Sequence, residues 1–343
     1  MPRGGAHFST EELVRVLSHY DIGIIIQVKP LSGGNMRAPK MAIVSQQGKF
    51  LLKRRPKGKD DLYRVAFAHA VQSHLAAQSF PVTCLLATRD KNNTVLQLNH
   101  HIYELFKFVT GTRYDGSEEA TVDAGRRLAE FHQYLADFAY ESALGGLKTC
   151  FHDSSTVRRH LKTLGSDRSN PNKKLRATAE DLMKLYNESS VRVNDSGFDS
   201  WAQQVIHGDW HPGNMLFSKN KLAAVLDFDS VRIAQPLTDL ANGMLQFSIV
   251  ANRPNPNDWP DYFDQDKLLQ FLSGYRRVIK PDKNKLNSLL DLMIETMIAE
   301  AVLPIVATGF FGHLSGTDFL QMILRKANWL NKNHNKLTQA ICS

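Results

Sequence analysis

The stretch that decides the fold is His207-Gly208-Asp209-Trp210-His211-Pro212-Gly213-Asn214, which lies between two short apolar runs. Val205-Ile206 precedes it, and Ala223-Ala224-Val225-Leu226 follows it and leads into Asp227-Phe228-Asp229. Runs of this length predict short strands, which would hold the acidic, amide and imidazole side chains close together. Magnesium prefers oxygen ligands, usually one or two side chains together with phosphate oxygens and water. The segment therefore predicts a magnesium–phosphate site in which Asn214 supplies a neutral oxygen and Asp227 a charged one.

The spacing of these residues matches a known catalytic loop. In protein kinases the loop runs His-Arg-Asp, four further residues and Asn, and a metal-binding Asp follows later in the chain. His207, Asp209 and Asn214 keep this interval, with Gly208 in place of the Arg. Because phosphoryl transfer requires mainly positioning and charge neutralisation, few reacting side chains are needed. Asp209 is then left to face a substrate hydroxyl.

With these motifs the chain resembles the aminoglycoside phosphotransferase/choline kinase superfamily, in which HGDxHxxN followed by DxD is characteristic. Within it, the chain looks like the homoserine-kinase-type and spore-coat-protein-S-like branch. The resemblance extends over nearly the whole chain and implies an ATP-dependent kinase in which Asp209 is the catalytic base. It also implies that Asn214 and Asp227 hold Mg²⁺. Three further residues take supporting roles by the same resemblance: His207 and Asp239 for the loop, and Asp229 for the metal or substrate.

The first hundred residues predict the strands of a nucleotide-binding lobe. Strand-like runs lie at 22–30, 41–45, 49–54, 94–99 and 101–109, with a helical pattern at 62–77. Gly33 and Gly34 follow the first run, and a glycine pair lets backbone N–H groups approach phosphate closely. Lys53 is expected to point into the cleft and pair the α- and β-phosphates, because strand alternation places Arg54 on the other face.

Long helical patterns replace the strands after Gly111. We therefore expect an N-lobe over 1–103, a hinge over 104–110 and a helical C-lobe with the catalytic loop and acceptor site over 111–343. Backbone groups around Glu104 and Phe106 in the hinge are expected to form hydrogen bonds with the edge of the adenine base. The predicted fold class is α+β, a protein-kinase-like bilobal fold with a small antiparallel-sheet N-lobe and a larger, mostly helical C-lobe.

One residue that the resemblance leads us to expect is missing. In kinases the strand lysine pairs with a Glu on the following helix. Here Ala68 stands near that place, and the nearest polar side chains, His69 and Gln72, are not carboxylates. Either another group steadies Lys53 or nucleotide binding is altered. This keeps open a second hypothesis, a catalytically silent kinase-like protein that acts in binding or assembly.

Two other classes are less favoured by the residues. His207 and His211 stand four apart, as in a helical zinc site, but Gly208, Pro212 and Gly213 oppose a continuous helix there. A protein kinase is disfavoured because no activation segment with an APE-like end follows Asp227. Trp210 could face a choline-like cation, although core packing is the preferred interpretation.

The composition indicates which kinds of ligand and which cellular location suit the protein. The formal charge of +8 suits an anionic ligand such as a nucleotide, and no nucleic-acid reader motif accompanies the basic runs. Three scattered cysteines fit a reducing compartment, and the apolar stretch 293–312 is too interrupted to span a bilayer. We expect a cytoplasmic protein whose acceptor is a small-molecule alcohol: an amino acid, amino alcohol, sugar or antibiotic. Family resemblance does not select among these.

Overall fold

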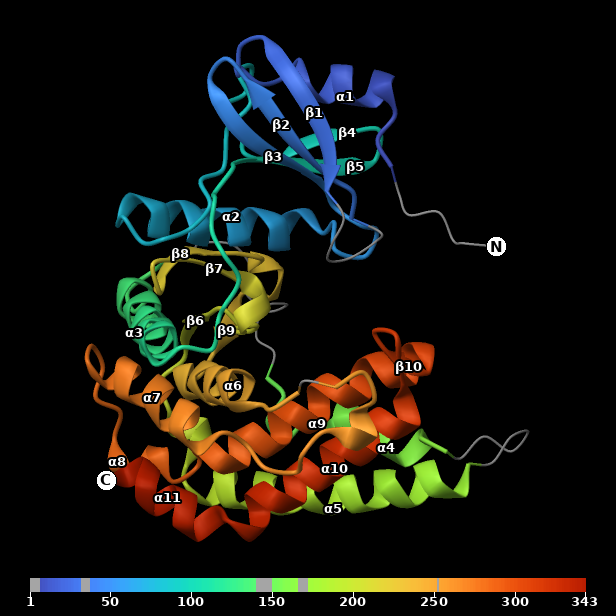
Figure 1. The fold of residues 1–343 in the computed structure, drawn as a ribbon, viewed down its shortest axis with the longest axis vertical. Helices are drawn as coiled ribbons and strands as arrows, with labels where there is room; N and C mark the ends of the chain where they lie inside the picture. Colours follow the sequence, from blue (N-terminus) through green and yellow to red (C-terminus); the bar gives the residue numbers. More distant parts are fainter. Residues whose placement is uncertain (1–6, 32–37, 140–149, 166–171, 252) are drawn as a thin grey trace. The chain divides into compact units, whose positions relative to one another are not determined.

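A five-stranded antiparallel sheet of order β1-β2-β3-β5-β4 is built from the N-terminal part of the chain (Figure 1). Its alternating side chains produce two chemically different faces. The second and third predicted runs correspond to β2 and β3, which form a hairpin that closes at Ser45 and Gly48. The strands are β1 (Ile25–Leu31), β2 (Lys40–Ser45), β3 (Gly48–Arg54), β4 (Leu96–Leu98) and β5 (His101–Lys107).

The structure, a computed structural model, describes residues 7–31, 38–139, 150–165, 172–251 and 253–343. Gly33 and Gly34, the predicted phosphate-approaching pair, lie outside the described residues. The chain separates into two compact units, which are described in turn below. The first unit comprises Met1–Arg113, Asp137–Leu144 and Asn214–Val231, and the second comprises Tyr114–Ala136, Gly145–Gly213 and Arg232–Ser343.

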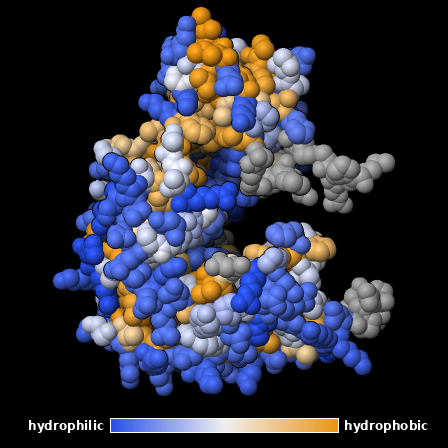
Figure 2. Space-filling view, viewed as in Figure 1, coloured by the Kyte–Doolittle hydropathy of each residue, from blue (hydrophilic) through white to orange (hydrophobic). Residues whose placement is uncertain are grey.

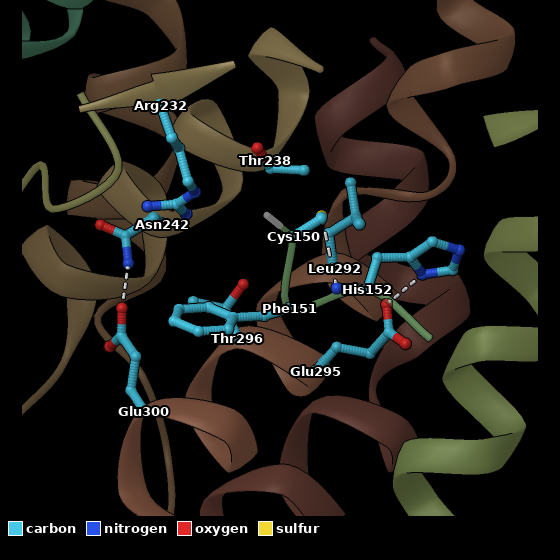
Figure 3. Close-up of a pocket in the computed structure, with 10 residues that line it drawn as sticks. All are labelled: Cys150, Phe151, His152, Arg232, Thr238, Asn242, Leu292, Glu295, Thr296 and Glu300. Atoms are coloured by element: carbon cyan, nitrogen blue, oxygen red, sulfur yellow. Dashed lines mark hydrogen bonds and ion pairs between the residues drawn. The ribbon is translucent and has the colours of Figure 1, made fainter. Parts of the chain in front are cut away.

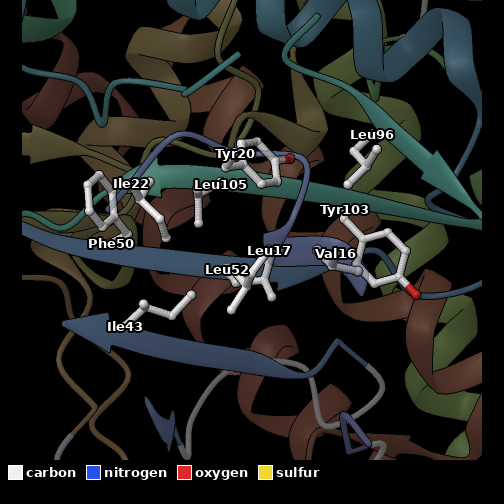
Figure 4. Packing of buried hydrophobic residues seen from close by; sticks show 10 residues of the cluster. All are labelled: Val16, Leu17, Tyr20, Ile22, Ile43, Phe50, Leu52, Leu96, Tyr103 and Leu105. Carbon is white, nitrogen blue, oxygen red and sulfur yellow. The ribbon is translucent and has the colours of Figure 1, made fainter. Parts of the chain in front are cut away.

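Helix α1 (Thr10–Leu17) covers one face of the sheet in the first unit. It begins with a capping box, in which Ser9 and Glu12 bond reciprocally to each other's backbone N–H. The apolar residues of α1 and of one sheet face form the core shown in Figure 4, a single cluster of buried side chains. Its members are Val16, Leu17, Tyr20, Ile22, Ile43, Phe50, Leu52, Leu96, Tyr103 and Leu105. The opposite face, which carries Lys53, is thereby left for polar chemistry.

Helix α2 (Leu62–Ala77) spans the residues predicted for it and is capped by Asp61, whose side chain accepts from the backbone N–H of Arg64. The hairpin of β7 (Met215–Ser218) and β8 (Lys221–Val225) belongs to the same unit. It is fastened there by the Val225 N–H, which donates to the Pro81 carbonyl at 2.8 Å. A short 3₁₀ turn, η4 (Phe228–Ser230), follows β8.

The second unit is mostly helical. Helices α3 and α7 touch at two glycines: a Cβ on Gly125 would lie 2.0 Å from the Phe271 carbonyl oxygen, and one on Gly274 would lie 2.0 Å from that of Val122. The apolar stretch 293–312 falls largely within α9. The helices are α3 (Glu118–Tyr134), α4 (Ser155–Thr163), α5 (Lys173–Asp195), α6 (Pro236–Ser248), α7 (Gln265–Arg276), α8 (Lys283–Leu286), α9 (Leu289–Thr308), α10 (Gly316–Lys332) and α11 (His334–Cys342).

Short strands and turns complete the second unit. The pairs are β6 (Gln204–Ile206) with β9 (Arg232–Ala234), and β10 (Phe310–Phe311) with β11 (Leu314–Ser315). The 3₁₀ turns are η2 (Phe198–Ser200) and η5 (Pro256–Asp258), and η3 (Pro212–Asn214) ends on the first residue of the adjoining segment of the first unit. The sheet and the helices together confirm the α+β class.

Surface hydropathy differs between parts of the chain. Figure 2 shows hydrophobic residues at the surface over the sheet of the first unit. Ile24, which precedes edge strand β1, and Ile26, which lies within it, are about two-thirds exposed (67% and 68%). The visible helices of the second unit are mostly hydrophilic on their outer side. Among the described helices, none is both long and apolar enough to cross a membrane.

Candidate active site

The backbone ahead of Asp209 is fixed by a buried carboxylate from helix α6. Asp239 accepts hydrogen bonds from the backbone N–H of His207 at 2.7 Å and from that of Gly208 at 2.8 Å. Gly208 has a φ of 76°, which glycine adopts without strain. Burial alone would raise the pKa of Asp239, but the hydrogen bond and charge of His132 hold it below its usual range. Asp239 therefore holds the backbone N–H groups of His207 and Gly208, the two residues before Asp209.

Aromatic packing holds the same loop from the core. His207 is fully buried, and its ring centroid lies 6.0 Å from that of Phe131 and 5.5 Å from that of Trp210. Trp210 is also fully buried. The structure therefore places Trp210 in the core, the preferred interpretation from sequence, and not where it could face a ligand cation.

Asp209 itself reaches the surface of the second unit. Its side chain is 38% exposed, and His211 Nε2 lies 3.6 Å from Asp209 Oδ2. The other ring nitrogen of His211 accepts the backbone N–H of Gly213 at 2.9 Å. A turn, not a helix, carries these residues, so the two histidines do not share a helical face. Asp209 is therefore an accessible carboxylate on a loop whose backbone is held by Asp239.

A pocket near this loop is built within the second unit from residues that the sequence motifs do not include (Figure 3). Figure 3 shows Arg232, Asn242 and Glu300 along one side, and His152 with Glu295 along the other. Arg232 donates to the Gly208 carbonyl at 3.1 Å and lies over the Phe151 ring, so it links the pocket to the loop. The lining residues are Cys150, Phe151, His152, Arg232, Thr238, Asn242, Leu292, Glu295, Thr296 and Glu300.

Glu300 is the unusual carboxyl group of this pocket. Its two oxygens accept from side-chain amides, Asn242 Nδ2 at 2.7 Å and Gln246 Nε2 at 2.9 Å. Burial, and then the negative charge of Asp209, raise its pKa from 4.5 to about 7. The Oδ1 atom of Asn242 is buried and has no hydrogen-bond partner. The pocket has a cavity volume of about 10 Å³, which is close to the space that one water molecule needs. Asn242 Oδ1 is the acceptor of this pocket that a small N–H donor would satisfy.

The predicted metal ligands Asn214 and Asp227 both belong to the first unit. Leu226, next to Asp227, donates its N–H to the carbonyl of Asn214 at 2.8 Å, so the two segments lie side by side. Asp227 adopts a left-handed conformation, with a φ of 57°, and its side chain is 42% exposed. An amide oxygen and a carboxylate are ligand types that fit Mg²⁺, which usually takes phosphate oxygens and water at its other positions. Among the described residues, no group of three or more His, Cys, Asp or Glu side chains could hold a metal.

Several cations surround Asp229 in the same unit. Its carboxylate lies 3.3 Å from Lys53 Nζ, 3.0 Å from Arg55 Nη1 and 3.4 Å from Lys59 Nζ. Burial opposes ionisation, yet these three charges hold the pKa of Asp229 at about 2. Burial, and then the charge of Lys53, lower the pKa of the nearby Lys40. Four cations around one carboxylate fit a polyphosphate ligand.

Strand alternation separates Lys53 from Arg54 as expected. Lys53 reaches Asp229, and also Asp227 at 3.8 Å. Arg54 instead binds Glu12 of helix α1 at 2.6 Å on the face that carries the apolar core. Lys53 thus lies on the polar face of the sheet, where Lys40 stands opposite it in the ladder between β2 and β3.

Glu104 and Phe106 lie within β5, opposite Lys53 and Leu51 of β3. The Glu104 side chain is buried and binds Arg55 at 2.8 Å and His69 at 2.6 Å. Sequence reasoning missed this side-chain role and missed Arg55 altogether. Alternation could have indicated Arg55, because it stands two residues after Lys53 and shares its face.

The model of the phosphotransferase enzyme family matches residues 27–278, well over half of the chain. The chain belongs to this family. The match contains every residue of the predicted catalytic loop and of the Asp227-Phe228-Asp229 motif. No curated protein matches the chain significantly.

Solved structures share the fold over almost their whole length. A microcompartment-associated aminopropanol kinase superposes with a TM-score of 0.72 at 13% identity, covering 96% of this chain and 99% of its own. An aminoglycoside phosphotransferase from Alicyclobacillus acidocaldarius gives 0.70 at 16% identity, covering 99% and 98%. The amicoumacin kinase hAmiN, solved in complex with AMP-PNP, Ca²⁺ and Ami, gives 0.67 at 12% identity, covering 97% and 94%. At these identities the likeness shows the fold, which is that of the protein-kinase-like phosphotransferases.

Proposed function

We propose that the protein transfers the γ-phosphoryl group of ATP to a hydroxyl group of a small molecule. The observation that carries this proposal is an exposed Asp209 on a loop whose backbone is held by Asp239, in a chain of the phosphotransferase family. Asp209 orients the acceptor hydroxyl and takes its proton as the oxygen attacks phosphorus. Bound Mg²⁺ supplies charge neutralisation for the phosphates.

The first unit holds the nucleotide in this proposal. Asn214 and Asp227 are the residues that would hold the metal, and Lys53 would bind the phosphates. Residues 1–103 act as the nucleotide-binding lobe, 104–110 as the hinge segment and 111–343 as the acceptor lobe with the catalytic loop. Contacts of the adenine edge with backbone near Glu104 and Phe106, and of phosphate with Gly33 and Gly34, remain predictions. Three cysteines without disulfides among the described residues fit a cytoplasmic location.

The acceptor is an alcohol that also carries an amine. Asn242 Oδ1 is an acceptor without a partner, it belongs to the side chain whose Nδ2 donates to Glu300, and Glu300 lies close enough to Asp209 for their charges to interact. An ammonium group on the substrate alcohol would donate hydrogen bonds to Glu300 and to Asn242 Oδ1, while the hydroxyl group of the same molecule faces Asp209. This selects amino alcohols, hydroxylated amino acids and amino sugars over neutral sugars.

Turnover on matched acceptors tests the proposal. ATP consumption with Mg²⁺ is measured against small amino alcohols and their deaminated analogues, for the wild type, Asp209→Asn and Glu300→Gln. Asp209→Asn abolishes turnover and keeps nucleotide binding. Glu300→Gln raises KM for the amine about tenfold or more and leaves KM for ATP unchanged. Asp199→Asn, at an exposed carboxylate of the second unit, is the matched control.

The outcomes separate two functions. Turnover that survives Asp209→Asn overturns the assignment of the base. Nucleotide binding that depends on Mg²⁺, with no transfer to any acceptor, favours the catalytically silent alternative. The observation behind that alternative is that no carboxylate of helix α2 pairs with Lys53, which binds Asp229 and Asp227 instead.

A further inference from the structure

Helix α2 contains no carboxylate that could pair with Lys53, and its side chains His69 and Gln72 form hydrogen bonds with other groups. His69 Nε2 lies 2.6 Å from Glu104 Oε1, and its Nδ1 lies 2.8 Å from Thr94 Oγ1. Gln72 donates to the Thr83 carbonyl at 2.6 Å. The partner of Lys53 must therefore come from another element of the first unit.

Glu104 stands directly opposite Lys53 in the ladder between β3 and β5. Side chains of directly opposed residues lie on the same face of an antiparallel pair, with Cβ atoms about 5 Å apart. The face is the polar one, because the neighbours Leu52 and Leu105 point into the apolar core. The positive charge of Lys53 also contributes to holding the pKa of Glu104 at about 2, against burial and alongside His69 and Arg55.

One oxygen of Glu104 is without a partner. Its Oε1 atom accepts from both Arg55 and His69, whereas Oε2 is buried and makes no hydrogen bond. An unpaired oxygen on a buried carboxylate is costly, and an ammonium donor would relieve the cost. Lys53 supplies such a donor from the opposite strand.

In the structure Lys53 is instead drawn to Asp229 and Asp227. These two carboxylates form the motif that includes the proposed metal ligand, so a metal-bound nucleotide competes with Lys53 for them. Arg55 already connects the two alternatives, because Nη1 binds Asp229 at 3.0 Å and Nη2 binds Glu104 at 2.8 Å.

We propose that Glu104 on strand β5 is the positioning residue that holds Lys53 against the nucleotide phosphates, in place of a carboxylate on helix α2. When nucleotide and metal occupy the first unit, Lys53 Nζ leaves Asp229 and donates to Glu104 Oε2. This inference rests on the proposed function, since it requires that the first unit bind ATP. The inference goes beyond the proposed function because it names the group that sets the position of Lys53.

A double-mutant cycle in binding tests the proposal. The affinity of a non-hydrolysable ATP analogue with Mg²⁺ is measured by calorimetry for the wild type, Lys53→Met, Glu104→Gln and the double variant. Glu104→Gln weakens analogue binding about tenfold when Lys53 is present. It has little further effect on the affinity of the Lys53→Met variant, because Glu104 acts through Lys53. A purely structural Glu104 would weaken both backgrounds equally, which overturns the proposal, as does an unchanged affinity in Glu104→Gln.

Two further measurements complete the design. Glu12→Gln removes a carboxylate that binds Arg54 on the opposite face of the same strand, so it lowers thermal stability without changing analogue affinity. A structure of the wild type with the analogue and Mg²⁺ gives the result even if Glu104→Gln does not fold. Lys53 Nζ within hydrogen-bond distance of Glu104 Oε2 supports the proposal, and Lys53 still on Asp229 overturns it. If the wild type binds no nucleotide, the proposed function itself fails.

Discussion

Asp239 Oδ1 accepts the backbone N–H of Gly208 at 2.8 Å, one residue before the proposed base. The second oxygen of Asp239 holds the preceding N–H, that of His207. A single carboxylate from helix α6 thus determines the path of the chain into Asp209, and the accessible position of Asp209 depends on it.

Replacing this support is expected to impair catalysis more than binding. Asp239→Asn keeps the shape but loses a charge and one acceptor, so the loop is held less accurately. Misplacement of a reacting group by about 1 Å can cost on the order of a hundredfold in rate. We predict a fall in kcat of tenfold to a hundredfold, with KM for ATP nearly unchanged and a lower Tm. A normal kcat in a folded Asp239→Asn protein would contradict this role.

Metal dependence is expected to follow Asp227. Asp227→Asn removes the charged ligand, so the Mg²⁺ concentration for half-maximal activity should rise tenfold or more. Asn also tolerates the left-handed backbone found at this position, so thermal stability should change little. Asp90→Asn, at an exposed carboxylate of the same unit, serves as the control. An unchanged Mg²⁺ requirement in Asp227→Asn would remove Asp227 from the metal site.

Stability should depend on pH through Glu300. Its pKa is raised to about 7 from 4.5, so the folded protein holds this proton over a range in which the unfolded chain has released it. The contribution is present below about pH 4.5 and is lost as pH rises through about 7, amounting to roughly 3 kcal/mol. Glu300→Gln removes the dependence, so urea unfolding should show its stability relative to the wild type increasing from pH 5 to pH 8. A constant difference across this range would show that Glu300 titrates normally.

The contact between α3 and α7 should not tolerate a methyl group. A Cβ at Gly125 would lie 2.0 Å from the Phe271 carbonyl oxygen, which is backbone and cannot turn aside. We expect Gly125→Ala to lower the free energy of unfolding by about 3 kcal/mol, as other overpacked sites do. Ser273→Ala, at an exposed position of α7, is the control and should change it little. Equal stabilities of the two variants would mean that the helices separate easily.

The sequence predicted the elements whose pattern is local. Alternation indicated the strands of the sheet, and helix α2 was predicted at Leu62–Ala77, the bounds that it has in the structure. Helix α5 was missed, because its buried stripe, which includes Leu182, Tyr186 and Val193, is diluted by polar residues over 23 positions. There the tertiary contact, not the local composition, determines which face is buried.

The residues of the candidate site also differ in whether a local pattern predicts them. Asp209, Asn214 and Asp227 were predicted because their spacing is a property of one short segment. Glu300 and Asn242 lie on different helices, 58 positions apart, so only packing brings them together. The side chain of Glu104 escaped notice because its role depends on the register that places it opposite Lys53.

The most direct test of the central claim is the product itself. The purified protein is incubated with ATP, Mg²⁺ and a panel of small amino alcohols, hydroxylated amino acids and amino sugars, and each acceptor is examined by mass spectrometry. The account predicts that at least one acceptor gains a single phosphate on its hydroxyl, and that Asp209→Asn forms none of this product. A protein that binds ATP and Mg²⁺ yet phosphorylates no acceptor of the panel would contradict it.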